Sequence, residues 1–355
     1  MSCNKCNEVF ELNHTPSKIY FMSEIDELMQ KSKLFITRLG IESDEHSSIS
    51  YIEVNDTKEF FSENIDAIVN EFNELERNSI KIFIQDEKTE FNFQSILGAK
   101  SLQRYINLIE DREFFDIVNN HSLTSYFQPI IKASDRSIYG YEALIRGVKE
   151  NGELMFPDVF FEKSERNDLN FKVDRLCRET ALKTAAVKGI SQKVFINFIP
   201  TTIYDPEFCL SSTVKWAKQL EFDPSNIVFE VVETENVKDK EHLKKILSYY
   251  REKGFQIALD DVGEGYSGLN MLISLKPNII KVDREIISNI DKDEFKQSVY
   301  KALYTLAKEN GIEVLAEGVE TSFELEMIES IGVDYIQGYY FAKPSAEPVR
   351  KLKRV

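Results

Sequence analysis

The chain has 355 residues, 42% of them hydrophobic, and its 60 acidic and 44 basic side chains give a net charge of −16. This length favours two domains, and the negative excess argues against binding of nucleic-acid polymers through their phosphates. An anionic small ligand would need bound metal ions to reverse the local field. The sequence contains no apolar run near the roughly 18 residues that a membrane span needs, and its N-terminus lacks the apolar core of a signal peptide. We therefore expect a cytoplasmic protein that binds neither a membrane nor a nucleic-acid polymer.

Residues 1–15 are predicted to form an N-terminal tail. Cys3 and Cys6 make a C-x-x-C pair, which is half of a zinc site. His14 is the only nearby candidate for a further ligand, and four cysteines in a chain of this length do not make a disulfide scaffold. Zinc or redox chemistry at this pair stays open, but the sequence favours an inert tail.

Residues 16–120 are predicted to form a small α/β domain that ends in a linking helix. Strand-like runs and helical patterns alternate there: strands at 18–22, 48–54 and 79–85, and helices at 24–39, 57–78 and 99–119. We find no phosphate-binding loop and no cluster of ligand residues in this stretch of sequence. A regulatory, dimerising or partner-binding module is the expectation, and its signal or partner is unknown.

Residues 121–350 carry a different pattern, in which strand-like runs alternate with helical segments. The eight runs are 126–131, 139–144, 194–198, 227–232, 256–260, 279–283, 313–317 and 335–341. Eight such alternations predict a TIM-like (β/α)8 barrel. The connection at residues 132–137 is too short for a crossover helix, so the first two strands must form a hairpin. We therefore expect a barrel with one antiparallel strand.

Most of the predicted strands end on a residue with a polar or charged side chain. In a barrel of this kind the strand C-termini surround the active site. The residues at these ends are Glu142, Asn197, Glu230 and Glu233, Asp260 and Asp261, Lys281 and Asp283, Glu317 and Glu320, and Gln337. Oxygen ligands without His or Cys suit Mg²⁺ or Mn²⁺, and so many carboxylates cannot all ionise without cations between them. The pattern predicts a site for more than one metal, which suits attack on a phosphate ester.

Each of these residues also has a purely structural interpretation. Asp261 could cap the next helix, Asp260 could meet a surface lysine, and Glu142 could pair with Arg146. What this account leaves unexplained is the coincidence of so many oxygen ligands at one end of one barrel.

The same residues stand in a series of motifs. In chain order these are QPI at 128–130, GYEALIR at 140–146, INF at 196–198, FEVVE at 229–233, DDVGEGYSGL at 260–269, KVD at 281–283, AEGVE at 316–320 and QGYYFAKP at 337–344. The series resembles the EAL domain family, the cyclic-di-GMP-specific phosphodiesterases of bacteria. The resemblance covers about residues 121–350 and does not reach the first third of the chain.

The resemblance implies two Mg²⁺ or Mn²⁺ ions in each barrel. The ligands it implies are Glu142, Asn197, Glu230 and Asp260 for the first metal, and Asp260, Asp261 and Glu317 for the second, with Asp283 close by. Lys281 matches the lysine beside the attacking water, and Glu317 and Glu142 are the further residues expected to take part in catalysis.

The resemblance also implies contacts with the substrate and between subunits. Gln128, Arg146 and Gln337 match substrate contacts, and Leu144 would lie against a guanine base. Glu233 matches the anchor of the glycine-bearing loop after Asp261, and Glu320 is assigned the same role. The family uses that loop for metal binding and dimerisation, so a homodimer is expected.

The implied reaction is hydrolysis of one phosphodiester bond of cyclic-di-GMP to give linear pGpG, under regulation by the N-terminal domain. The chain departs from the common pattern at Val262, where an aromatic residue is frequent, and at Glu264, where a small polar residue is frequent. Two alternatives stay open: a receptor or protein-interaction module without turnover, and a different metal-dependent barrel enzyme. Receptors of this family usually lack ligand residues, and none is missing here, so the enzyme is favoured.

Overall fold

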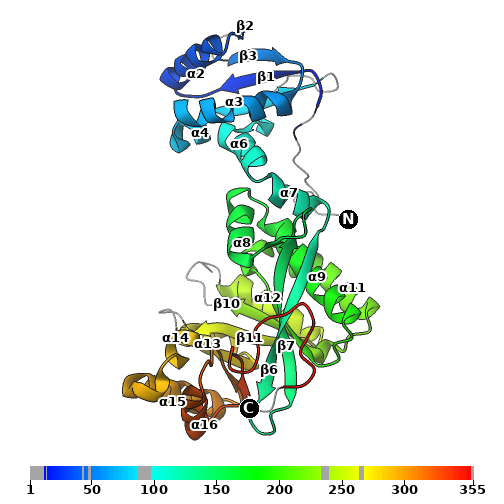
Figure 1. Ribbon diagram of the computed structural model, residues 1–355, viewed down its shortest axis with the longest axis vertical. Coiled ribbons are helices and arrows are strands. Elements are labelled where there is room, and N and C mark those ends of the chain that lie inside the picture. The colour runs from blue at the N-terminus through cyan, green and yellow to red at the C-terminus, as the bar shows by residue number, and fades with distance from the viewer. Residues whose placement is uncertain are drawn as a thin grey trace. The chain divides into compact units, whose positions relative to one another are not determined.

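The computed structural model describes residues 12, 14–41, 44–46, 49–86, 97–232, 240–263 and 268–352. The chain divides into two compact units, Met1–Asn119 and Asn120–Val355 (Figure 1). Within the described residues, no helix is both long and apolar enough to span a lipid bilayer. Cys3 and Cys6 lie outside the described residues, so the weak zinc prediction stays a prediction.

The first unit is a small α/β domain, as predicted. Its described strands form an antiparallel sheet in the order β2–β3–β1–β4–β5. The strands are β1 (Ser17–Met22), β2 (Asp44–His46), β3 (Ile49–Val54), β4 (Lys81–Gln85) and β5 (Lys100–Ser101). The helices are α2 (Asp26–Arg38), α3 (Thr57–Glu71), α4 (Glu74–Ser79), α6 (Leu102–Glu110) and α7 (Arg112–Asn119). The order β-α-β-β-α-β, with β1 between β3 and β4, is ferredoxin-like.

The two long helices predicted in this unit were wrong, because each is broken. The helix expected at 57–78 stops where Phe72 adopts an extended backbone. Asn73 then starts α4 with a capping box: its side chain accepts from the Glu76 N–H at 3.0 Å, and the Glu76 carboxylate accepts from the Asn73 N–H at 2.8 Å. The helix expected at 99–119 is divided at Asp111, whose backbone leaves the helical region. Helical periodicity continues through such breaks, so the pattern of apolar residues does not reveal them.

The second unit contains the predicted barrel. Eight of its described strands pair in a closed ring, in the order β6–β14–β13–β12–β11–β10–β9–β7–β6. These strands are β6 (Leu123–Lys132), β7 (Ile138–Val148), β9 (Lys193–Asn197), β10 (Ile227–Val232), β11 (Gln256–Val262), β12 (Ile279–Val282), β13 (Glu313–Ala316) and β14 (Tyr335–Ile336). Among them β6 runs antiparallel to both neighbours, and the other pairings are parallel. The predicted hairpin between the first two barrel strands is therefore confirmed.

Helices surround these strands (Figure 1). They are α8 (Pro157–Arg166), α9 (Asn170–Val187), α10 (Pro206–Cys209), α11 (Ser211–Gln219), α12 (Lys240–Glu252), α13 (Gly268–Leu275), α14 (Arg284–Ile287), α15 (Glu294–Glu309) and α16 (Ser322–Ile331). Short 3₁₀ turns are η1 (Pro200–Thr202), η2 (Pro224–Asn226) and η3 (Ile290–Lys292), and the two-residue strand β8 (Leu154–Met155) pairs with the end of β7. The main core lies between strands and helices, where every second strand residue is apolar.

The interior of the barrel has an apolar layer with a polar layer above it. The apolar layer takes one residue from each of seven described barrel strands: Ile130, Phe195, Val228, Ala258, Ile279, Leu315 and Tyr335. Two positions further along each parallel strand of this set comes a polar residue: Asn197, Glu230, Asp260, Lys281, Glu317 and Gln337. Because strand side chains alternate between the two faces, these polar residues also point inward. The alternation therefore builds a polar mouth at the C-terminal ends of the parallel strands.

The last barrel strand is shorter than the predicted run 335–341, because the chain turns at Gly338. The Tyr340 N–H donates to the Val319 carbonyl at 3.0 Å, and the Phe341 N–H donates to the Gly338 carbonyl at 3.1 Å. A Cβ on Gly338 would lie 2.0 Å from the Val319 carbonyl oxygen. Only glycine allows this close approach of two backbone segments.

Replacing Gly338 by alanine is expected to destabilise the barrel unit by about 3 kcal/mol, the upper range for overpacking. Urea unfolding of the 355-residue chain measures the loss. Gly152→Ala is the matched control, because Gly152 has φ of +85° but open space around its Cβ position. Backbone strain alone should cost about 1–2 kcal/mol there. Equal losses in the two variants would contradict the steric explanation.

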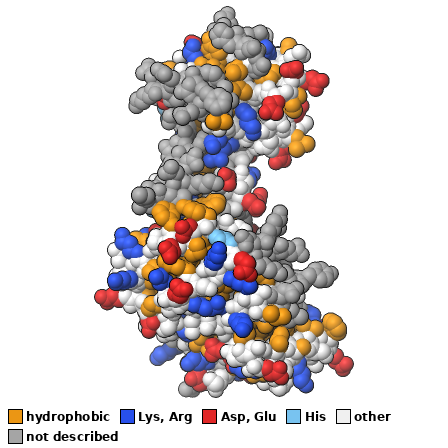
Figure 2. Space-filling view, turned by 180° about the vertical axis from the view of Figure 1, so that it is seen from behind, with side chains coloured by type: hydrophobic (Ala, Val, Ile, Leu, Met, Phe, Trp, Pro, Cys, Tyr) orange, Lys and Arg blue, Asp and Glu red, His pale blue; other side chains and the backbone are white. Residues whose placement is uncertain are grey.

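Acidic and basic side chains are mixed over the described surface in Figure 2. Lysine and arginine are scattered among aspartate and glutamate on the face shown, without a broad area of one sign. On this face the net charge of −16 is therefore not gathered into one acidic patch.

Candidate active site

A bulge in β11 brings two consecutive carboxylates together. In a regular strand Asp260 and Asp261 would point to opposite faces. The pairing of β11 with β12 shifts register between Leu259 and Val262, and Asp261 has φ of +53°. As a result, carboxylate oxygens of Asp260, Asp261 and Glu317 lie within 4.8 Å of one another. These three residues form a group that could hold a divalent cation.

Lys281 is the cation at the centre of this mouth. Its Nζ lies 2.6 Å from Glu230 Oε1, 2.9 Å from Asp260 Oδ1 and 2.9 Å from Glu317 Oε1. Burial acts to lower the pKa of Lys281, but the surrounding carboxylates outweigh burial and raise it well above its usual range. The ammonium group is therefore charged, and it is outnumbered by the carboxylates it contacts.

Glu230 is fully buried and incompletely satisfied. Neither of its carboxylate oxygens accepts a well-formed hydrogen bond from a described residue, although Lys281 is within ion-pair distance. Burial raises the pKa of Glu230 well above its usual range, and the neighbouring carboxylates of Glu142 and Asp260 raise it further, against the opposing effect of Lys281. A buried carboxylate without hydrogen-bond donors is costly. The arrangement fits a site in which a further cation completes the coordination of these oxygens.

Glu142 is oriented by two side-chain amides. Asn197 Nδ2 donates to Glu142 Oε1 at 3.2 Å, and Gln337 Nε2 donates to Oε2 at 2.6 Å. Gln337 Nε2 also lies 3.1 Å from Gln128 Oε1, and Gln128 is directly opposite Glu142 in the β6–β7 register. The structure therefore links Gln128 and Gln337, expected as substrate contacts, to a residue expected as a metal ligand.

Leu144 and Arg146 follow Glu142 at every second position of β7 and so share its face. The guanidinium of Arg146 lies 5.2 Å from the ring centre of Tyr126 and 5.1 Å from that of Phe156. Its Nε is buried without a hydrogen-bond partner among the described residues. This side chain is held in place by aromatic rings, and its guanidinium is of the type that suits a phosphate oxygen.

The remaining expected site residues lie at the edge of the mouth or outside the description. Asp283 caps α14, where its carboxylate accepts from the Glu285 N–H at 2.6 Å, and it is not in the group of three carboxylates found among the described residues. Glu320 is exposed and pairs with Arg284 at 3.0 Å. Glu233 lies outside the described residues.

A metal would find a consistent set of donors here. Asp260, Asp261 and Glu317 could hold one ion, and Glu142, Asn197 and Glu230, with Asp260, could hold another. The donors are carboxylate and amide oxygens, which suit Mg²⁺ or Mn²⁺. The incompletely satisfied oxygens of Glu230 are the observation that favours a cation beyond Lys281.

The sequence reasoning missed a buried ion pair behind the site. Asp174 and Arg178 lie one turn apart on α9, and both are almost completely buried. The Asp174 carboxylate contacts the loop that follows Asn197. The available signal was a D-x-x-x-R spacing on an otherwise apolar helix face.

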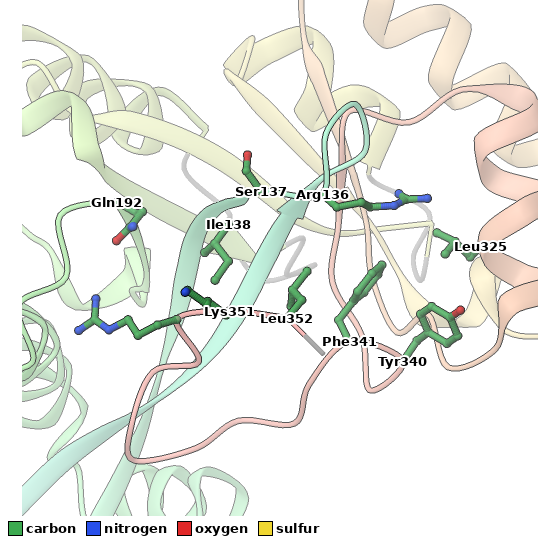
Figure 3. Close-up of a pocket in the computed structure, with 10 residues that line it drawn as sticks. Arg136, Ser137, Ile138, Gln192, Leu325, Tyr340, Phe341, Lys351 and Leu352 are labelled. Carbon is green, nitrogen blue, oxygen red and sulfur yellow. The ribbon is translucent and has the colours of Figure 1, made fainter. Parts of the chain in front are cut away.

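A separate hollow of about 770 Å³ lies at the opposite end of the barrel, where β7 and β9 begin (Figure 3). Aromatic and basic side chains line it, including Phe341, Arg136 and Arg350. Arg136 pairs with Glu329, and Arg350 donates to backbone carbonyls at the end of α9. Because both guanidinium groups are already engaged, we assign no ligand to this hollow.

Comparison with known proteins identifies the family. The model of the EAL domain matches residues 111–344 of the chain. The chain belongs to the EAL domain family. The resemblance seen in the sequence motifs is thereby confirmed, and the polar mouth lies within the matched region.

Two curated relatives of this EAL protein come from Escherichia coli K12. The probable cyclic di-GMP phosphodiesterase PdeG is 30% identical over 256 residues, which are 70% of this chain and 50% of that protein. The cyclic di-GMP phosphodiesterase PdeF is 29% identical over 222 residues, which are 59% of this chain and 30% of that protein. The chain spans about half or less of the length of these relatives.

Solved structures of similar fold include ligand complexes. A standalone versatile EAL protein from Vibrio cholerae O395, in a c-di-GMP bound form, is 42% identical with a TM-score of 0.59 and covers 65% of this chain and 95% of the other. A manganese/cy-diGMP complex of BlrP1 from Klebsiella pneumoniae has a TM-score of 0.57 and covers 93% of this chain and 96% of the other. At 20% identity the second likeness concerns the fold alone.

Proposed function

We propose that this EAL protein is a metal-dependent phosphodiesterase that hydrolyses one phosphodiester bond of cyclic-di-GMP and releases linear pGpG. The observation that carries the proposal is the group of carboxylates around Lys281 at one barrel mouth, beside a Glu142 that accepts from two side-chain amides. Membership of the EAL family supports it. So do the activity named for PdeF and the ligand in the Vibrio cholerae structure.

The proposed metal ligands are divided between two ions. Glu142, Asn197, Glu230 and Asp260 would hold a first ion, and Asp260, Asp261 and Glu317 would hold a second, with Asp283 nearby in the sequence motif. When bound, two divalent cations lower the pKa of a water molecule and neutralise the phosphate under attack. Gln337 and Asn197 hold the Glu142 carboxylate in one orientation for this purpose.

Lys281 orients the attacking water and offsets negative charge that develops on the phosphate. In the reaction the water oxygen forms a bond to phosphorus, and the bond from phosphorus to the 3′ oxygen breaks. The water gives up a proton and the 3′ oxygen takes one, so the reaction is balanced without another reactant. Glu317 and Glu142 act by keeping the phosphate under attack correctly placed relative to Lys281.

The substrate is bound by residues on β6 and β7 and by Gln337, which follows β14. The guanidinium of Arg146, held near the rings of Tyr126 and Phe156, donates to a phosphate oxygen. Leu144 lies against a guanine base, and Gln128 and Gln337 contact the dinucleotide from the side of Glu142. The N-terminal unit regulates this activity.

The 355-residue chain is expected to form pGpG from cyclic-di-GMP when Mg²⁺ or Mn²⁺ is added, and product formation should stop when EDTA is present. Chromatography of the reaction mixture measures the product, and Ca²⁺, which binds oxygen ligands at longer distances, serves as the control metal. Tight binding of the dinucleotide without pGpG would contradict turnover and favour the receptor alternative.

The predicted homodimer stays a prediction. The loop on which it rests continues through residues 264–267, which lie outside the described residues, as does its proposed anchor Glu233. Glu320, the other proposed anchor, pairs with Arg284 at the edge of the mouth.

A further inference from the structure

The buried pair formed by Asp174 and Arg178 has no role in the reaction proposed above. Asp174 is 2% exposed and Arg178 is 1% exposed, and both belong to α9 on the outside of the barrel. A buried ion pair adds little stability compared with apolar residues of the same size, because both charges must be desolvated. Its presence in an apolar layer therefore calls for a role other than stability.

The pair connects α9 to the loop that leaves β9. One oxygen of Asp174 accepts from the Ile199 N–H at 2.8 Å, and the other lies 3.0 Å from the Thr202 hydroxyl, which also lies 2.7 Å from the Ile199 carbonyl oxygen. Arg178 pairs with the Asp174 oxygen that faces Thr202, and its Nε donates to the Thr213 hydroxyl of α11 at 3.2 Å. The carboxylate is thus fixed by one charged partner and fixes two points of the loop.

The loop begins directly after Asn197, a proposed ligand of the first metal. The Phe198 N–H still faces the carbonyl of Glu230 on the neighbouring strand, at 3.4 Å. The next N–H, that of Ile199, leaves the strand pairing and goes to Asp174 instead. The bond from Ile199 to Asp174 therefore lies where the backbone leaves the barrel, immediately beyond Asn197.

We propose that Asp174, oriented by Arg178, is a positioning residue that aims the Asn197 side chain into the mouth and so sets the affinity of the first metal. The side chain of Asn197 lies 3.2 Å from Glu142 Oε1, which leaves it little freedom to compensate for a shift of its backbone. This inference deepens the proposed function, and its readout is binding of Mn²⁺ rather than hydrolysis.

The test measures free Mn²⁺ by electron paramagnetic resonance while the 355-residue chain is titrated. Asp174→Ala is expected to weaken binding of the first Mn²⁺ about 10-fold, the lower range for loss of an outer partner of a metal ligand. Asp174→Asn should recover part of the affinity, because its amide oxygen can still accept from the Ile199 N–H. An Asp174→Ala protein that is folded and binds Mn²⁺ within about twofold of the wild type would overturn the inference.

Asp334→Ala is the matched control. Asp334 also pairs with a base, Lys308 at 2.9 Å, and accepts from a backbone N–H, that of Val314 at 2.8 Å, but it precedes β14 at the far end of the barrel. This variant should lose stability without losing affinity for Mn²⁺. An equal loss of affinity in both variants would mean that general destabilisation is the cause, and would overturn the inference.

A double variant covers the case in which Asp174→Ala fails to fold with Arg178 left unpaired. Asp174→Leu/Arg178→Met removes both charges, a change that buried pairs often tolerate, and it still deletes the acceptor for Ile199. It should show the same loss of about 10-fold, and unchanged affinity would overturn the inference.

A wild-type protein that binds Mn²⁺ but forms no pGpG would refute the proposed function while leaving this test intact. A wild-type protein that does not bind Mn²⁺ would refute both.

Discussion

Replacing Glu142 by alanine is expected to reduce formation of pGpG by about 1000-fold or more, beyond the 10- to 100-fold cost of losing an outer partner of a metal ligand. The variant removes a proposed ligand of the first metal. It also removes the carboxylate that accepts from Asn197 at 3.2 Å and from Gln337 at 2.6 Å, although Gln337 keeps Gln128 as an acceptor. Initial rates with Mn²⁺ at saturating cyclic-di-GMP measure the effect.

Two further variants complete this test: one separates loss of charge from loss of shape at Glu142, and the other is a control at a distant carboxylate. Glu142→Gln keeps the volume and one acceptor oxygen but removes the charge, so it should be nearly as inactive as the alanine variant. Glu150→Ala changes an exposed carboxylate beyond the end of β7 and should leave the rate unchanged. Turnover by Glu142→Ala at the wild-type rate would sink the assignment of Glu142 to the metal site.

Replacing Lys281 by methionine is expected to abolish hydrolysis and to make the metal-free protein less stable. The ammonium group is within 2.9 Å of an oxygen of each of Glu230, Asp260 and Glu317. Removing one partner of a buried ion pair typically costs about 3–5 kcal/mol, because the remaining charge is left uncompensated. The metal-free variant should therefore unfold at a lower temperature than the metal-free wild type.

Mn²⁺ should stabilise the Lys281→Met protein more than it stabilises the wild type. The ammonium group contacts carboxylates that would also hold the metal, so the metal would meet less competition in the variant and would stabilise the folded state by binding to it. Thermal unfolding with EDTA and with Mn²⁺ measures the difference. Lys308→Met, which removes the half-exposed partner of Asp334, is the control and should respond to Mn²⁺ as the wild type does. A smaller stabilisation of Lys281→Met than of the wild type would show that Lys281 does not share oxygens with the metal.

The sequence by itself determined the fold class and the chemical character of the site. Strand and helix periods are local properties of the chain, and the connection at 132–137 has a length that allows only a hairpin. The ligand type is equally local, because carboxylates at the ends of strands can be read one at a time. The period of two along each strand also places residues such as Val228 and Glu230 on one face.

Tertiary structure alone decided how these residues meet. A regular strand would separate Asp260 from Asp261, and it is the pairing with β12 and the positive φ of Asp261 that bring both near Glu317. The ion pairs of Lys281 join residues that are far apart in the chain, so no local sequence pattern predicts them.

The loop contact of Asp174 and the turn at Gly338 have the same origin. Asp174 meets a backbone N–H 25 residues away, and Gly338 is required because another segment, at Val319, lies against it. Periodicity and motif spacing indicate the chemical type of each residue and the face of its strand on which the side chain lies. Register shifts, close backbone approaches and buried pairs depend on which segments become neighbours, and that is settled only when the barrel closes.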